Sequence, residues 1–170
     1  MLSMNSDENT PRRPLGAYRF IRGSSNSNGY AALGKAVELQ SQHPAFGNRP
    51  FGEWSKILMG QINRGHFAFI ACEDKITGFI GWLRTDRASG EAWLHENKHV
   101  KDPNVPMGEA VVVNAIQAED RGALRLIRAK ATELEKPPFT IYAKRFYKDG
   151  TIRPLTYDVS VEPDERRIRP

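Results

Sequence analysis

Apolar residues recur every three or four positions in three parts of the chain, and this spacing predicts three helices. The first covers residues 33–41 and has a ragged apolar stripe. The second covers residues 52–63 and has one clear apolar face, and Gly65 is expected to cap its C-terminus. The third begins after Asp120, which is a suitable N-cap, and ends before Pro137-Pro138.

Between and after these helices, the apolar pattern changes to one that is typical of strands. Two apolar runs surround Glu73-Asp74-Lys75 and predict a β-hairpin, and two late runs flank a turn at Asp149-Gly150. A further run directly before the third helix is apolar enough for a central strand. The predicted strands cover residues 66–72, 76–83, 108–117, 139–144 and 152–159, and the polar stretch 84–107 is expected to contain a loop excursion.

This order of elements predicts an α/β fold with a mixed, mainly antiparallel sheet flanked by helices. A length of 170 residues is typical of a single domain. Residues 1–29 are polar and are expected to form a flexible N-terminal arm, in which residues 18–21 can pack as a short segment. Residues 30–161 are expected to form the domain, and residues 162–170 a charged tail.

The composition narrows the classes of function. The net charge of +5 is mild and the basic residues do not alternate with aromatic ones, so no nucleic-acid partner is expected. No apolar run approaches the roughly 20 residues of a membrane helix, and the N-terminus lacks the apolar segment of a secretory signal, so we expect a cytoplasmic protein. The single cysteine, Cys72, lies in an apolar run and is expected to be buried. The spacing of the histidines matches no metal-ligand set, and no metal site is predicted.

Four segments, taken in order, carry a resemblance to a known family. They are the helical stretch that ends in His43, the pair His66-Phe-Ala-Phe-Ile70 and Gly78-Phe-Ile-Gly-Trp82, and Asp120-Arg-Gly-Ala-Leu124. With them the chain resembles, over residues 33–159, the RTX toxin-activating lysine acyltransferases of the hemolysin-activating type. The resemblance implies a GNAT-like fold, transfer of a fatty acyl chain from acyl carrier protein to internal lysines of a protoxin-like protein, and a homodimer. It implies no permanently bound cofactor, because the donor is the phosphopantetheine thioester of the carrier protein.

The same resemblance implies that His43 and Asn114 are the catalytic residues. His43 follows Ser41-Gln42 at the end of the first helix, where the family has its functional histidine. An imidazole with an unperturbed pKa of about 6.5 suits a general base at neutral pH. Asn114 matches the family's aspartate, and an amide can orient the imidazole by a hydrogen bond but brings no full charge. On this hypothesis, Asn114→Asp keeps or raises activity. The alternatives are a helix-end histidine and a hydrogen-bonded core asparagine.

The candidate donor-binding residues are Arg121, Gly122 and Ala123, which stand at a strand-to-helix junction. Backbone N–H groups at a helix N-terminus can hold the phosphate of the phosphopantetheine arm, although an ordinary capped helix start explains the same residues. Several basic residues nearby form either a docking surface for the acidic carrier protein or a solvated face: Arg125, Arg128, Lys130, Lys144, Arg145 and Lys148.

Two alternative functions remain open at this point. A GNAT-like N-acyltransferase could act on a peptide or a small amine with acyl-CoA as donor. A catalytically silent binding protein could use the same fold, and Asn114 in place of an acidic residue favours this second alternative.

Overall fold

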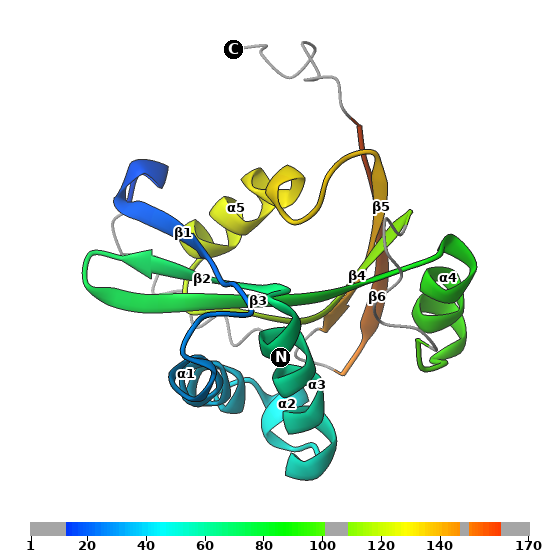
Figure 1. Ribbon diagram of the computed structural model, residues 1–170, viewed down its shortest axis with the longest axis horizontal. Helices are drawn as coiled ribbons and strands as arrows, with labels where there is room; N and C mark the ends of the chain where they lie inside the picture. Colours follow the sequence, from blue (N-terminus) through cyan, green and yellow to red (C-terminus); the bar gives the residue numbers. More distant parts are fainter. Residues whose placement is uncertain (1–12, 101–108, 147–149, 161–170) are drawn as a thin grey trace.

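Six strands form one sheet in their sequence order in the computed structural model, which describes residues 13–100, 109–146 and 150–160. Neighbouring strands are antiparallel except β4 and β5, which are parallel. β1 and β6 are therefore the edges of the sheet (Figure 1). The strands are β1 (Tyr18–Arg22), β2 (Phe67–Cys72), β3 (Lys75–Thr85), β4 (Ala110–Ala118), β5 (Phe139–Phe146) and β6 (Ile152–Val159).

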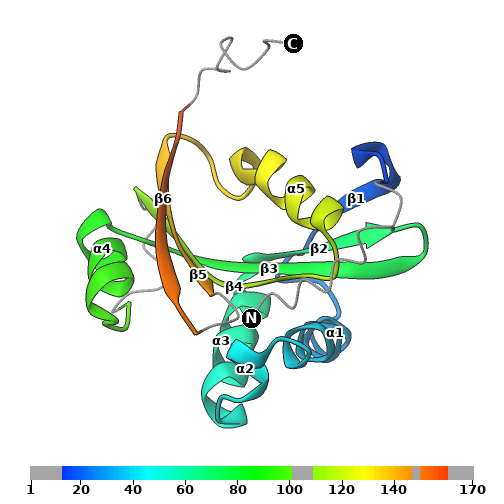
Figure 2. The ribbon, with the colours of Figure 1, turned by 180° about the vertical axis from the view of Figure 1, so that it is seen from behind.

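Helices cover both faces of this sheet. Three of them, α1, α2 and α3, lie together on one face, and α5 lies on the other (Figures 1 and 2). α4 packs against β4 and β5. The helices are α1 (Gly29–Ser41), α2 (Pro44–Gly47), α3 (Phe51–Arg64), α4 (Arg87–Glu96) and α5 (Arg121–Ala129), with short 3-10 turns η1 (Leu15–Ala17) and η2 (Ala131–Glu133).

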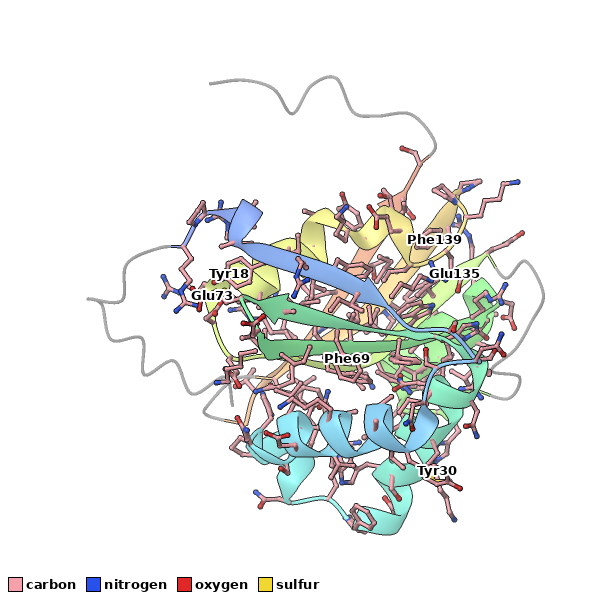
Figure 3. The ribbon with its side chains drawn as sticks, turned by 60° about the vertical axis from the view of Figure 1, so that its left-hand side comes forward. Tyr18, Tyr30, Phe69, Glu73, Glu135 and Phe139 are labelled. Carbon is pink, nitrogen blue, oxygen red and sulfur yellow. The ribbon has the colours of Figure 1, made fainter. Side chains whose placement is uncertain are left out.

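Alternation of side chains along the strands divides the apolar core into layers. Ile80 and Trp82 of β3 pack with α5. Phe79, the residue directly before Ile80, packs with α1 and α3 on the opposite face. Phe69 lies on this second face, between the sheet and α1 (Figure 3). The two layers together keep the central strands out of water, so β3 and β4 form a rigid base for any site above or below them.

Several sequence predictions are confirmed. The fold is a mixed α/β sheet flanked by helices, and the predicted hairpin is the antiparallel pair β2–β3. Gly65 caps α3 in the left-handed region with φ 70°. Asp120 caps α5 by accepting a hydrogen bond from the Ala123 backbone N–H. Cys72 is buried.

The sequence pattern predicts no helix within residues 84–107, but α4 forms there. Asp86 begins this helix by accepting a hydrogen bond from the Ser89 N–H, and Leu94 anchors it in the core. Gly90 lets the Tyr142 ring pack close, because a Cβ there would come within 2.6 Å of that ring. A central glycine weakens helix propensity, and a helix that buries so few apolar side chains shows little periodicity in the sequence.

Other elements differ from their predicted bounds. The helix after Asp120 ends at Ala129, and residues 131–133 form a separate 3-10 turn rather than its last turn. Residues 18–22, within the predicted N-terminal arm, form the edge strand β1. Residues 1–12, 101–108, 147–149 and 161–170 lie outside the described part of the chain, and with them the predicted tail at 162–170, Lys148 and part of the turn at Asp149.

Candidate active site

The parallel strands β4 and β5 separate part-way along their length. Their pairing stops at Val113 and Ala143, although β4 continues to Ala118 and β5 to Phe146. In Figures 1 and 2, β5 and β6 stand at a steep angle to the other four strands. The backbone groups of β4 and β5 that face each other beyond Val113 and Ala143 are therefore not used in pairing these strands, and they suit an extended ligand.

Asn114 lies where the strands separate, on a bulge of β4. On the β3 side, Trp82 pairs with Val113 and Gly81 pairs with Ala115, so Asn114 has no partner residue in either neighbouring strand. The side-chain alternation shifts at this point, because Val113 packs on the α5 side and Ala115 on the α1–α3 side. Bulges re-aim side chains in this way, and this one directs the Asn114 amide to α3.

Gln61 of α3 holds the Asn114 amide in place. Asn114 Oδ1 accepts a hydrogen bond of 2.5 Å from Gln61 Nε2. Gln61 is fully buried, and its amide packs against Gly81 of β3. A Cβ at Gly81 would come within 2.1 Å of Gln61 Oε1. Glycine is thus needed at this position because the side chain of Gln61 occupies the space where a Cβ would be.

His43 belongs to the same face of the sheet, where it is the N-cap of α2. Its Nδ1 accepts a hydrogen bond of 3.1 Å from the Ala45 backbone N–H, so the neutral ring carries its proton on Nε2. The residue is only 6% exposed, and burial lowers its pKa to about 4. His43 is therefore neutral at pH 7, with Nε2–H as a hydrogen-bond donor.

A series of ring contacts connects His43 with the separated end of β5. His43 packs edge-on against Phe46 with ring centroids 5.5 Å apart, and Phe46 packs against Phe146 at 6.3 Å. His43 and Asn114 thus lie on the same side of the sheet, but no hydrogen bond joins these two described residues. The structure does not contain the orienting contact expected from the sequence, and the catalytic roles of both residues stay predictions.

Sequence analysis missed two glutamines beside these residues. Gln40 and Gln61 are both fully buried, and Gln40 stands one helical turn before His43. Neither atom of the Gln40 amide has a hydrogen-bond partner among the described residues. The sequence could have indicated them as glutamines on the apolar face of a helix. Gln40, for example, lies four positions after Ala36 and so on the same face as that residue. Buried amides without partners are rare in folded proteins, so their place beside His43 and Asn114 is informative.

At the start of α5, the structure provides a packing reason for the predicted donor-binding residues. The Asp120 carboxylate accepts hydrogen bonds from the Ala123 N–H at 2.8 Å and from the Tyr18 hydroxyl at 3.0 Å. Burial and the bond to Asp120 raise the pKa of Tyr18 to about 12, so its hydroxyl stays a donor. A Cβ at Gly122 would come within 2.3 Å of Tyr18 Oη. A capped helix start therefore explains Gly122 and Ala123, Arg121 is exposed, and donor binding by these three residues stays a prediction.

A second polar cluster, centred on His66, lies on the α5 side of the sheet. His66 stacks on Trp82 with ring centroids 6.1 Å apart, and its Nε2 accepts a hydrogen bond of 3.2 Å from Arg84. Glu135 accepts a hydrogen bond of 2.9 Å from Trp82 Nε1 and lies on the α5 side in Figure 3. Burial is the main cause that lowers the pKa of His66 to about 4. These contacts connect Glu135, in the segment after η2, with β3 and with His66, the residue directly before β2.

Two kinds of feature are absent from residues 13–100, 109–146 and 150–160. Within them, no three side chains of His, Cys, Asp or Glu come together as a set that could hold a metal ion. None of the helices in the same ranges is both long enough and apolar enough to cross a membrane.

Comparisons with known proteins show likeness in structure but not in sequence. No family model matches the chain, and no curated protein matches it. Among solved structures, the chain is similar to the loading GNATL domain of CurA from Lyngbya majuscula, with a TM-score of 0.51, 16% identity, 78% of this chain and 66% of that one covered. It is also similar to the GphF GNAT-like decarboxylase in complex with isobutyryl-CoA, with a TM-score of 0.51 and 16% identity. That match covers 77% of this chain and 67% of the decarboxylase. The chain thus spans about two thirds of each of these structures, and its fold is GNAT-like.

Proposed function

We propose that this protein transfers an acyl group from a phosphopantetheine thioester to an amine. The observation that carries the proposal is the separation of β4 and β5 beyond Val113 and Ala143 in a GNAT-like fold. A pantetheine arm contains secondary amides and ends in the thioester sulfur. Such an arm can lie along the separated strands and bond to their backbone groups, as an added strand would. The GphF structure contains isobutyryl-CoA, which carries an arm of this kind.

The reaction itself needs few protein groups. The amine nitrogen attacks the thioester carbonyl, a C–N bond forms, the C–S bond breaks, and the thiol leaves. An amine with a pKa of about 10.4 must also lose a proton, and His43 is the candidate base. To accept that proton at Nδ1, His43 has to give up its hydrogen bond from Ala45. If the cap bond persists, Nε2–H instead donates a hydrogen bond to the substrate.

The finer assignment is a fatty acyl chain on acyl carrier protein as donor and an internal lysine of a protein as acceptor. The sequence resemblance supports it. Arg125 and Arg128 are exposed on α5, and opposite charge accelerates encounter with an acidic carrier protein. A homodimer is proposed on the same resemblance, and light scattering at micromolar concentration tests it.

Intact-mass measurement tests the function. The donors are octanoyl acyl carrier protein and octanoyl-CoA, and the acceptors are N-acetylated peptides that each contain one internal lysine. We expect an octanoyl mass increase on the peptides, faster with the carrier protein, and none on matched peptides with arginine in place of lysine. Transfer from CoA alone would support the peptide or small-amine alternative. Binding of donor without transfer would support a silent binding protein, a reading favoured by the engagement of His43 Nδ1 in the α2 cap.

A further inference from the structure

We propose that Asn114 donates a hydrogen bond from Nδ2 to the carbonyl oxygen of the donor thioester, and that Gln61 is the residue that positions it. The inference rests on the proposed function and names a different role for Asn114 from that of a partner for His43. Three features carry it: the hydrogen bond that orients the Asn114 amide, the packing that fixes Gln61, and the place of Asn114 at the separation of the strands.

The hydrogen bond from Gln61 sets which way the Asn114 amide faces. Gln61 Nε2 donates a hydrogen bond to Asn114 Oδ1. A primary amide is planar, and its oxygen and nitrogen point in different directions from the same carbon. With Oδ1 turned to α3, Nδ2 and its two hydrogens point away from Gln61. Gln61 is fully buried while Asn114 is half-buried, and with Oδ1 bonded to Gln61 the amide of Asn114 has Nδ2 left as the donor for a ligand.

Packing prevents Gln61 from turning. The residue shares a helix face with the buried Leu58 and neighbours the buried Ile62. The missing Cβ of Gly81 leaves the space that its amide fills. A hydrogen-bond donor that is held in this way needs little reorganisation when charge develops on a substrate oxygen. Such preorganisation is the main requirement of an oxyanion site.

Asn114 stands at the base of the gap between β4 and β5. It is the residue directly after Val113, where the pairing with β5 ends. An arm that enters along the separated strands brings its thioester towards this base. Attack by the amine converts the carbonyl oxygen to an oxyanion, and the Nδ2–H group stabilises that charge before the C–S bond breaks and the thiol leaves.

Charge-changing variants separate this role from that of a partner for His43. Asn114→Asp keeps an acceptor for Gln61 but replaces Nδ2–H by a second carboxylate oxygen, which repels the oxyanion. Gln61→Glu removes the donor to Oδ1 and offers an acceptor instead, so the Asn114 amide turns and presents its oxygen to the gap. Both variants are expected to lower kcat by about 100- to 1,000-fold, the usual effect of losing an oxyanion donor, with little change in the KM of the donor. Asn63→Asp makes the same chemical change on the exposed side of α3 and is expected to keep wild-type kinetics.

The measurement is steady-state transfer of octanoyl groups by each variant, with a melting curve to show that it folds. If a carboxylate variant fails to fold, Asn114→Ala and Gln61→Met replace it, because they bring no charge. Both are also expected to lower kcat. An Asn114→Asp enzyme with kcat near that of the wild type would overturn the inference and support Asn114 as the partner of His43, while leaving the proposed function intact. Failure of the wild type to transfer from either donor would instead overturn the proposed function, and this inference with it.

Discussion

At the residue scale, the candidate site is a group of polar side chains buried beneath α1 and α3. A buried amide loses its hydrogen bonds to water, and leaving it without a partner costs about 1–3 kcal/mol. Gln40 and Gln61 both bear part of this cost, since within the described part of the chain Gln40 has no partner for either amide atom and Gln61 Oε1 has none. Apolar residues would pack in these positions at a lower cost, so the amides are better explained by binding or catalysis than by stability.

Substitution of His43 distinguishes its structural role from its chemical one. His43→Asn retains an oxygen that can accept the Ala45 N–H, because asparagine is a good N-cap, and is expected to keep wild-type stability. His43→Ala loses the cap, and we expect about 1 kcal/mol of destabilisation. If His43 is the base, both variants lose about 100- to 10,000-fold in kcat. Urea unfolding and steady-state kinetics measure the two effects, and an active His43→Asn enzyme would show that the imidazole is not catalytic.

The two buried histidines make stability depend on pH. Burial lowers the pKa of His43 and of His66 to about 4, against about 6.5 in the unfolded chain. Between these values the unfolded chain binds more protons, so the stabilisation present above pH 6.5 is lost as the pH falls to 4. The loss is on the order of 3 kcal/mol for each residue.

Melting temperatures between pH 4 and pH 7 check this dependence. His43→Asn and His66→Gln are each expected to flatten the profile, whereas His95→Gln, at an exposed position on α4, is the control and leaves it unchanged. An unaltered profile in the His66→Gln protein would contradict the assignment of this dependence to His66.

At the scale of elements, one packing contact at the start of α5 explains Gly122, the glycine that the sequence suggested as part of a phosphate site. Gly122→Ala is expected to destabilise the protein by about 1–3 kcal/mol, because the new methyl group meets the Tyr18 ring. Gly34→Ala is the matched control on α1, where a Cβ would come within 4 Å of no described atom beyond its chain neighbours and the backbone of its own helix, and we expect it to stabilise the protein by up to about 1 kcal/mol.

A second substitution tests whether contact with Tyr18 is the cause. Tyr18→Leu combined with Gly122→Ala should cost less than the sum of the two single changes, since the smaller side chain leaves room for the methyl group. Thermal or urea unfolding measures both. A Gly122→Ala protein of normal stability with a raised KM for the donor would instead show that Gly122 binds the donor phosphate.

At the scale of the whole molecule, the angle between β1–β4 and β5–β6 creates the gap that the proposed function uses (Figure 1). A thioether analogue of octanoyl-CoA, which cannot react, is expected to slow amide hydrogen exchange in residues 114–118 and 144–146, because its arm bonds to their backbone groups. The edge strand β1, at the far side of the sheet, is the internal control and should exchange as before. Protection limited to the start of α5 would place the donor there and not in the gap.

Much of the fold follows from the sequence because its signals are local. The apolar face of α3, the left-handed cap at Gly65 and the Asp120 cap of α5 depend on residues a few positions apart. The same local information predicted a mixed sheet and a helix that ends near His43, which the structure makes the N-cap of α2 rather than part of α1. α4 was missed because its periodicity is weak and its central glycine makes sense only beside Tyr142.

The candidate site depends on contacts between residues far apart in the chain. His43, Gln61 and Asn114 are each recognisable in the sequence as polar residues, but which of them bond is decided by the bulge in β4 and by the packing of α3 on Gly81. The family resemblance suggested His43 as the partner of Asn114, and the folded chain instead pairs Asn114 with Gln61, 53 positions away. Sequence periodicity indicates which face of an element is buried, but the separation of β4 from β5 arises only when all six strands twist together in one sheet.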